Sequence, residues 1–211
     1  MASAPRWRAA EGMSVVRLRA AVTLRRSLIA LCGLLLVVGL AACGHASPHQ
    51  NFADANNDGD YVSAGYITYQ LQISRELNQY STEDSAYLKG LPSGVSPSLG
   101  PDQLWYGVFL WAKNQSGRKA TTSDNFEVVD TQGNVYHPVR LDPQVNPFAW
   151  TSQTLPNLAT YPGPNTVASE GATQGGLLLF KVSTDVYSNR PLTLYILGPG
   201  NRRLGGISLN L

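Results

Sequence analysis

Thiols and imidazoles, the side chains most reactive at neutral pH, are few in this sequence. The thiols and imidazoles belong to Cys32, Cys43, His45, His49 and His137. Cys43 has the most informative surroundings, because it directly follows one branched apolar residue and two small ones, Leu40, Ala41 and Ala42. A thiol can be alkylated as a thiolate, and small residues before it would let the preceding peptide bond enter a peptidase.

The segment before Cys43 predicts export from the cytoplasm. Residues 28–42 are apolar and uncharged, and they follow Arg25-Arg26. A basic segment before a short apolar run is the layout of a secretory signal, and this run is shorter than the ~20 residues that a membrane-spanning helix needs. Leu40-Ala41-Ala42-Cys43 resembles a bacterial lipobox, in which the cysteine receives a diacylglyceryl group and becomes the first residue. We therefore predict a cleaved lipoprotein signal peptide over residues 1–42 and a lipid anchor on Cys43.

Two alternatives use the same apolar run differently. An ordinary secretory signal could be cut after Ala46, which would leave Cys43 incidental, or the run could stay uncleaved as an anchor helix. Leu40 is too large for the small residue expected three positions before an ordinary cut. A cysteine at the end of the apolar run, with none after it, also favours lipidation.

The charges divide the chain into a basic leader and a mildly acidic remainder. Residues 1–42 carry six arginines and one glutamate, a net charge of +5, whereas residues 43–211 carry 10 Lys+Arg and 13 Asp+Glu, a net charge of −3. The exported part has no basic stripe along its sequence, so nucleic acid is excluded as a partner. Translation could begin at Met1 or at Met13 without changing this interpretation.

Residues 43–60 are predicted to be a lipidated flexible tether. They are small, polar and rich in Asn and Asp, with little to bury in a core. Asp54–Asp60 matches the first half of a calcium-binding loop, but the twelfth position, which should supply a bidentate carboxylate, is Gly65. A soluble linker with a turn at Asp58-Gly59 is the better interpretation, and we predict no metal site.

From residue 61 onward, apolar and polar residues alternate in short segments that predict β-strands. The expected strands are 66–73, 104–113, 126–130, 135–141, 176–182, 191–197 and 206–211. One short helix is expected between Thr82 and Gly90. The pattern predicts an all-β, immunoglobulin-like antiparallel β-sandwich over residues 61–211, stabilised by its core because no disulfide is available.

The strand at 104–113 is apolar on both faces, although a sandwich strand needs only one apolar face. The stretch 142–173 is long, rich in proline and carries further aromatic residues. We hypothesise that this stretch lies across the outer face of the strand. Whatever stays uncovered would be a contact surface. The candidate contact residues are Trp105, Phe109, Trp111, Phe148, Trp150 and Tyr161.

Residues 61–211 lack a convincing catalytic pattern. His137 is the single histidine there, and no Gly-x-Ser-x-Gly turn supplies a nucleophile. Glu76 and the pair Glu83-Asp84 could in principle act as paired carboxylates, but charged residues on a short helix are usually solvated. We therefore expect no enzyme activity and no cofactor.

Three segments of the domain also resemble a family of bacterial exported lipoproteins of uncharacterised function, common in actinobacteria. The shared features are an Asn-x-Ser turn, a D-x-x-G hairpin and a G-x-L-x-F strand, at residues 114–116, 130–133 and 176–180. The resemblance covers about residues 61–211 and implies an immunoglobulin-like domain with a lipobox, without catalytic residues.

These features together predict a lipid-anchored lipoprotein on the extracytoplasmic face of the cell membrane. Its domain is expected to act as a non-catalytic binding or scaffolding module for an envelope protein or a small ligand. Two alternatives stay open: a small-ligand carrier with an aromatic pocket, and a cell-envelope hydrolase built around His137.

Overall fold

The computed structural model describes residues 54, 55, 59, 61–209 and 211, all in the second of two compact units, His49–Leu211. The predicted signal peptide, the lipobox residues and Cys43 lie outside the described residues. Within the described part of the chain, no helix has the length and apolarity needed to cross a membrane.

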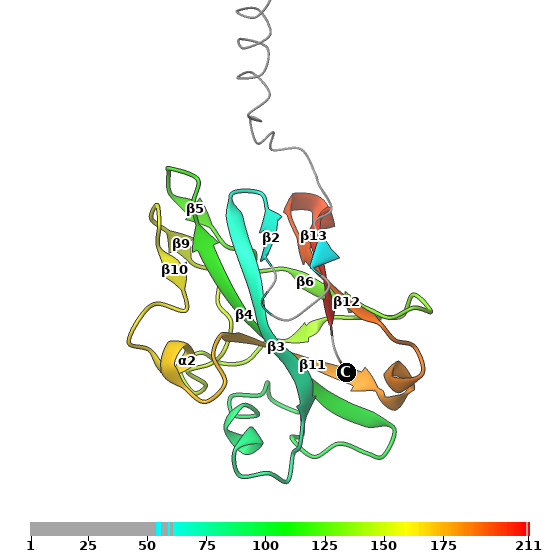
Figure 1. Ribbon diagram of the computed structural model, residues 1–211. Helices are drawn as coiled ribbons and strands as arrows, with labels where there is room; N and C mark the ends of the chain where they lie inside the picture. The colour runs from blue at the N-terminus through cyan, green and yellow to red at the C-terminus, as the bar shows by residue number, and fades with distance from the viewer. Residues whose placement is uncertain (1–53, 56–58, 60, 210) are drawn as a thin grey trace, which may run out of the picture. The chain divides into compact units, whose positions relative to one another are not determined.

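Two sheets pack face to face in a largely antiparallel β-sandwich (Figure 1). In spatial order, the first sheet contains β1 (Asp54–Ala55), β13 (Arg203–Leu209), β12 (Leu192–Leu197), β6 (Phe126–Val129) and β7 (Val135–Tyr136). The second contains β2 (Tyr61–Ala64), β3 (Ile67–Leu77), β4 (Gln103–Asn114), β11 (Gly176–Ser183) and β8 (Pro138–Val139), with β10 (Thr160–Tyr161) also beside β4. A separate pair consists of β5 (Ala120–Thr121) and β9 (Thr154–Leu155). The short helices are η1 (Asp84–Ala86), α2 (Val167–Glu170), η2 (Thr184–Tyr187) and η3 (Pro199–Asn201).

The strand order confirms the predicted immunoglobulin-like fold. β3, β4, β11 and β8 occupy the places of strands A, B, E and D in one sheet, and β13, β12, β6 and β7 those of G, F, C and C′ in the other. The helix expected between Thr82 and Gly90 is only the single 3₁₀ turn of η1. Within the described residues, the α-helix is α2, which lies instead in the proline-rich stretch, where Thr166 and Ser169 form a capping box.

One predicted strand divides between the two sheets. Residues 135–141 form β7, which pairs with β6, and β8, which pairs with β11, and His137 lies between them. Pro138 cannot donate a backbone hydrogen bond, and β8 is accordingly short and at the edge of its sheet. The segment therefore crosses from one layer to the other.

The end of the predicted tether belongs to the domain. Asp54–Ala55 pair in parallel with Gly206–Ile207 of β13. The Gly59 N–H donates to the carbonyl of Leu71 at 2.8 Å, and Gly59 accepts from the side chain of Gln70. Three residues within the range predicted to be a tether, Asp54, Ala55 and Gly59, therefore pair or form hydrogen bonds with strands of the sandwich.

The main core fills the space between the two sheets. Alternate residues of β4 point into it, namely Leu104, Tyr106, Val108 and Leu110. Residues of β11 and β12 complete it, including Phe180 and Leu194, both 0% exposed. Burying each such side chain contributes about 1.5–3 kcal/mol, so this layer supplies most of the driving force for folding.

A second core lies on the opposite face of the β3-β4-β11 sheet. It consists of Leu77, Tyr87, Leu88, Trp105, Phe109, Leu177 and Leu179, with Leu91, Val95, Leu99, Leu141 and Phe148 packed around it. We call residues 79–101, which connect β3 to β4 and supply much of this layer, the covering segment. Gly107 lies beside this second core, since a Cβ there would be 3.1 Å from Leu77, 3.2 Å from Cε2 of Phe109 and 3.3 Å from Leu177.

An ion pair fastens the covering segment to the sheet. Arg75 on β3 donates two hydrogen bonds to the carboxylate of Asp84 in η1, at 2.6 and 3.1 Å. The backbone N–H of Asn78 donates to the same carboxylate at 2.8 Å. Burial by itself would raise the pKa of Asp84, but these hydrogen bonds outweigh it and hold the pKa below its ordinary value.

We predict that this ion pair makes stability fall in acid. The pKa of Asp84 is lower in the folded state than in the unfolded chain. The stability that Asp84 adds to the fold is therefore fully present above the ordinary pKa of about 3.9, and it is lost as the pH falls through the lowered value. Urea unfolding between pH 7 and pH 2.5 should show this loss, and Asp84→Asn should be less stable at pH 7 and lose less on acidification. Asp142→Asn, at an exposed position, is the control. Equal acid sensitivity of the Asp84→Asn protein and the wild type would contradict this account.

Candidate functional site

Two of the predicted contact residues on the outer face of β4, Trp105 and Phe109, are sealed inside the domain. Trp105 and Phe109 are 1% and 0% exposed, so a contact surface formed by these two side chains is wrong. The ring of Tyr87 contacts Phe109 edge-on with centroids 5.1 Å apart, and it contacts Phe148 in the same way at 4.8 Å. The indole N–H of Trp105 donates to the carbonyl of Pro97 at 2.7 Å.

The outer face is covered as the sequence suggested, but mainly by a different part of the chain. The proline-rich stretch contributes Phe148, and Leu141 comes from the residue just before it. Most of the cover comes from the covering segment, whose Tyr87 and Leu88 are buried. Trp111 is only half-buried, and its indole nitrogen is buried without a hydrogen-bond partner among the described residues.

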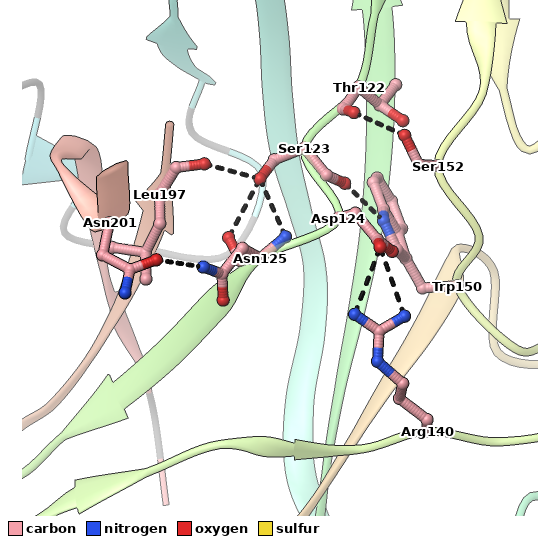
Figure 2. A network of polar contacts seen from close by, with 9 residues as sticks. All are labelled: Thr122, Ser123, Asp124, Asn125, Arg140, Trp150, Ser152, Leu197 and Asn201. Carbon is pink, nitrogen blue, oxygen red and sulfur yellow. Dashed lines mark hydrogen bonds and ion pairs between the residues drawn. The ribbon is translucent and has the colours of Figure 1, made fainter. Parts of the chain in front are cut away.

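Trp150 and Tyr161 close the main core rather than forming an external patch. The Trp150 ring lies 4.9 Å from Tyr161, 5.4 Å from Phe126 and 6.1 Å from Tyr69, measured between centroids. The Trp150 indole N–H donates to the carbonyl of Ser123 at 2.9 Å (Figure 2). The backbone N–H of Trp150 donates to Leu177, so this aromatic residue is fixed to the edge of a sheet.

Burial of this aromatic cluster changes the acidity of one member. Burial raises the pKa of Tyr69 to about 12, although the hydrogen bond that its oxygen accepts from the Ser123 N–H acts in the opposite direction. Tyr69 therefore stays neutral across the physiological pH range. Five of the six candidate residues divide between two packed cores, Trp111 belongs to neither, and together they do not line one aromatic pocket.

Ser123 is the centre of a polar network that joins both sheets at one end of the sandwich (Figure 2). Its hydroxyl donates to Leu197 and to Asn125, at 2.7 and 2.9 Å. Asn125 in turn donates to Asn201 in the β12–β13 turn at 2.7 Å. The neighbouring Asp124 accepts from Arg140, but both of these side chains are largely exposed, so this pair contributes little to stability.

Asn114 connects the loops at the same end of the sandwich. The sequence predicted only a turn at this residue. Its side chain is 0% exposed. The amide nitrogen donates to the carbonyls of Arg118, Leu155 and Pro156 at 2.6, 2.8 and 3.1 Å. The amide oxygen accepts from the backbone N–H and the hydroxyl of Ser116. One buried amide thus connects the β4–β5 loop to the β9–β10 loop.

An open cleft of about 580 Å³ lies at the opposite end of the sandwich. It is lined by Gly100, Asp102, Gln103, Tyr136, Lys181, Val182 and Ser183. Burial, followed by the charges of Asp130 and Asp185, raises the pKa of Tyr136. The cleft offers hydrogen-bond donors and acceptors to a polar ligand. The alternation of apolar and polar residues in the sequence gave no indication of this cleft.

The residues considered for catalysis do not form a reactive set. His137 is exposed, and within residues 61–209 no carboxylate pairs with it. Asp84 is held by Arg75, while Glu76 accepts a hydrogen bond from Tyr187, which raises the pKa of that phenol. Among the described residues, no group of three or more His, Cys, Asp or Glu side chains is arranged to hold a metal ion.

Comparisons with known proteins give structural likeness at low sequence identity. No protein-family model matches the chain, and no curated protein matches it. The YjhA protein from Bacillus subtilis aligns with a TM-score of 0.46 and 12% identity, over 74% of this chain and 99% of its own. An uncharacterised β-sandwich protein from Clostridium difficile 630 aligns with a TM-score of 0.36 and 12% identity, over 79% of this chain and 100% of its own.

We predict that Asn114→Asp destabilises the domain by about 2–4 kcal/mol, because a carboxylate cannot donate to the three carbonyls and would be buried beside them. Urea unfolding at pH 7 measures the loss. Asn157→Asp makes the same chemical change at an exposed position, where the side chain only accepts a hydrogen bond from Gly117. A similar stability for the two variants would remove the role assigned to Asn114.

Proposed function

We propose that the chain is a lipoprotein, anchored through a diacylglyceryl group on Cys43 to the extracytoplasmic face of the membrane. Its immunoglobulin-like domain serves as a non-catalytic binding or scaffolding module. The proposal of a lipid anchor depends on one observation. Cys43 directly follows Leu40-Ala41-Ala42, at the end of a leader that has a basic segment followed by an apolar one.

The packing of the domain supports a binding module over the alternative of a small-ligand carrier with an aromatic pocket. The aromatic side chains that would line such a pocket contact one another instead, as Trp150 does with Tyr161 and as Tyr87 does with Phe109. The hydrolase alternative needs His137 beside a hydroxyl and a carboxylate in one cleft. The exposed position of His137 gives that alternative no support.

The anchoring is tested with the two cysteines as a matched pair. In the native host, the wild type and Cys32→Ala should fractionate with membranes, begin at residue 43 and carry lipid mass on that residue. Cys43→Ala should carry no such mass. Two or three acyl chains hold a protein firmly, whereas one chain alone is marginal, so salt washing should not release the wild type. Wild-type protein that begins elsewhere, or lacks lipid, would refute the anchoring.

A further inference from the structure

One end of the sandwich gathers positive charge although residues 43–211 carry a net charge of −3. We call this the basic end and define it by four loops, residues 65–66, 115–119, 156–159 and 198–202. Asn114 connects the second and third of these loops. A Cβ on Gly205 would lie 3.9 Å from Cβ of Ala64, which brings the β12–β13 turn beside the β2–β3 turn. Figure 1 shows these turns together, around the labels of β2, β5 and β13.

The four loops contain Arg118, Lys119 and Arg202, all exposed, and no carboxylate. Lys113, at the end of β4, adds a further exposed cation. Two acidic side chains beside these loops are paired, Asp124 with Arg140 at 3.1 Å and Glu127 with Arg203 at 2.6 Å.

The opposite end has the reverse balance. Its loops, residues 78–102, 130–134 and 184–191, carry five carboxylates against two cations, and one of the five, Asp84, is paired with Arg75 of β3. The acidic residues are Glu83, Asp84, Asp102, Asp130 and Asp185. The domain is thus electrically polarised along its strands, with the positive pole at the basic end.

The basic end also exposes two large apolar side chains. Tyr66 is 53% exposed, and the guanidinium of Arg118 lies over its ring, 3.9 Å from the centroid. Leu158 is 66% exposed at the tip of its loop, with φ at 65°, a left-handed conformation that leucine seldom adopts. Its N–H donates to the Asn114 carbonyl at 2.7 Å, so the hydrogen-bonded loop holds this leucine outward.

The direction of β1 relates the basic end to the predicted anchor. β1 runs parallel to β13, with Asp54 opposite Gly206 and Ala55 opposite Ile207. The N-terminal end of β1 therefore faces the end at which β13 begins, which is the basic end. Cys43 is eleven residues before Asp54, and a chain of that length spans at most about 40 Å.

We propose that the basic end docks on the anionic headgroups of the membrane that holds the Cys43 lipid, so that the domain rests against the bilayer. This proposal depends on the lipid anchor proposed above. Lys113, Lys119 and Arg202 contact the headgroups, while Tyr66 and Leu158 enter the interface between headgroups and acyl chains. Each cation near an anionic surface strengthens binding about fivefold.

The geometry also sets which part of the domain faces outward. When the basic end lies on the membrane, the polar cleft around Asp102 and Lys181 points away from it. Negative charge at that end would be repelled by the same headgroups, so both poles favour one orientation.

The test uses the natively lipidated protein, purified and reconstituted into vesicles. Cys32 is removed with the signal peptide and Cys43 is blocked by lipid, so one introduced cysteine can carry a fluorophore. Gln115→Cys labels the basic end and Gln132→Cys labels the opposite end, both at exposed turn glutamines. Lipid-borne nitroxide at the headgroups should quench the first label and not the second, in vesicles of about 30% phosphatidylglycerol in phosphatidylcholine.

Charge variants isolate the electrostatic contribution. Lys119→Gln with Arg202→Gln should lower the ratio of docked to undocked protein about 25-fold, from about fivefold for each charge. Lys89→Gln with Lys181→Gln removes the same charge from exposed positions elsewhere and should leave the quenching unchanged. Pure phosphatidylcholine, or 0.5 M salt, should release the basic end of the wild type in the same way.

The outcomes separate this proposal from the anchoring. Protein that does not stay on vesicles and carries no lipid contradicts the anchoring. Lipidated protein that stays on vesicles while both labels remain unquenched overturns the docking and leaves the basic end available to a protein partner. Equal quenching of both labels, or quenching that is insensitive to lipid charge, also overturns it.

Discussion

The fold depends on β4, a strand of the β-sandwich whose side chains are apolar on both faces. Every residue from Leu104 to Leu110 is buried. Leu104, Tyr106, Val108 and Leu110 enter the space between the sheets, while Trp105 and Phe109 face the other way. A sheet in a simple sandwich leaves its outer face to water, so a chain with this strand must supply another layer or expose a large adhesive surface. The covering segment is that layer.

This constraint explains where the aromatic residues are used. Tyr87 and Phe148 complete the second core, and Trp150 and Tyr161 close the main one. A tryptophan or tyrosine that packs against its own domain is not available to a partner. A binding surface of the kind that we propose would therefore lie at the ends of the sandwich, where loops, charges and a polar cleft are exposed. The loops at one end of the domain are basic and those at the other end are acidic, and the described part of the domain exposes no single large apolar face.

Much of the architecture follows from local patterns, and the rest depends on contacts that alternation does not encode. Alternating residues predicted β3, and the run of large apolar residues predicted both β4 and its need for a cover. The identity of the cover was missed, because Tyr87 and Leu88 lie where start and stop signals predicted only a short helix, and those signals assigned no buried face to it. Residues 135–141 have the pattern of one strand, yet Pro138 and a change of partner place β7 and β8 in different sheets.

The candidate surfaces were harder to predict than the fold for a physical reason. Asn114 has the appearance of a turn residue, and its connections to Leu155 and Pro156 span 41 and 42 positions along the chain. The charge polarity likewise arises only when loops distant in sequence meet at one end, since the sequence after Cys43 has mixed charge throughout. The prediction for Cys43 is different, because it rests on a local motif of four residues. That motif can be recognised without any tertiary contact.

The central claim, that the outer aromatic face is sealed, is tested most directly by hydrogen exchange at one indole. In the full chain, the indole N–H signal of Trp105 can be assigned by its loss in Trp105→Phe. The hydrogen bond to Pro97 and the burial of the ring predict that this proton exchanges only when the covering segment opens, far more slowly than an exposed indole. Exchange at the rate of a free indole would contradict the account. It would mean that the covering segment does not close over β4 and that the aromatic face is open to partners.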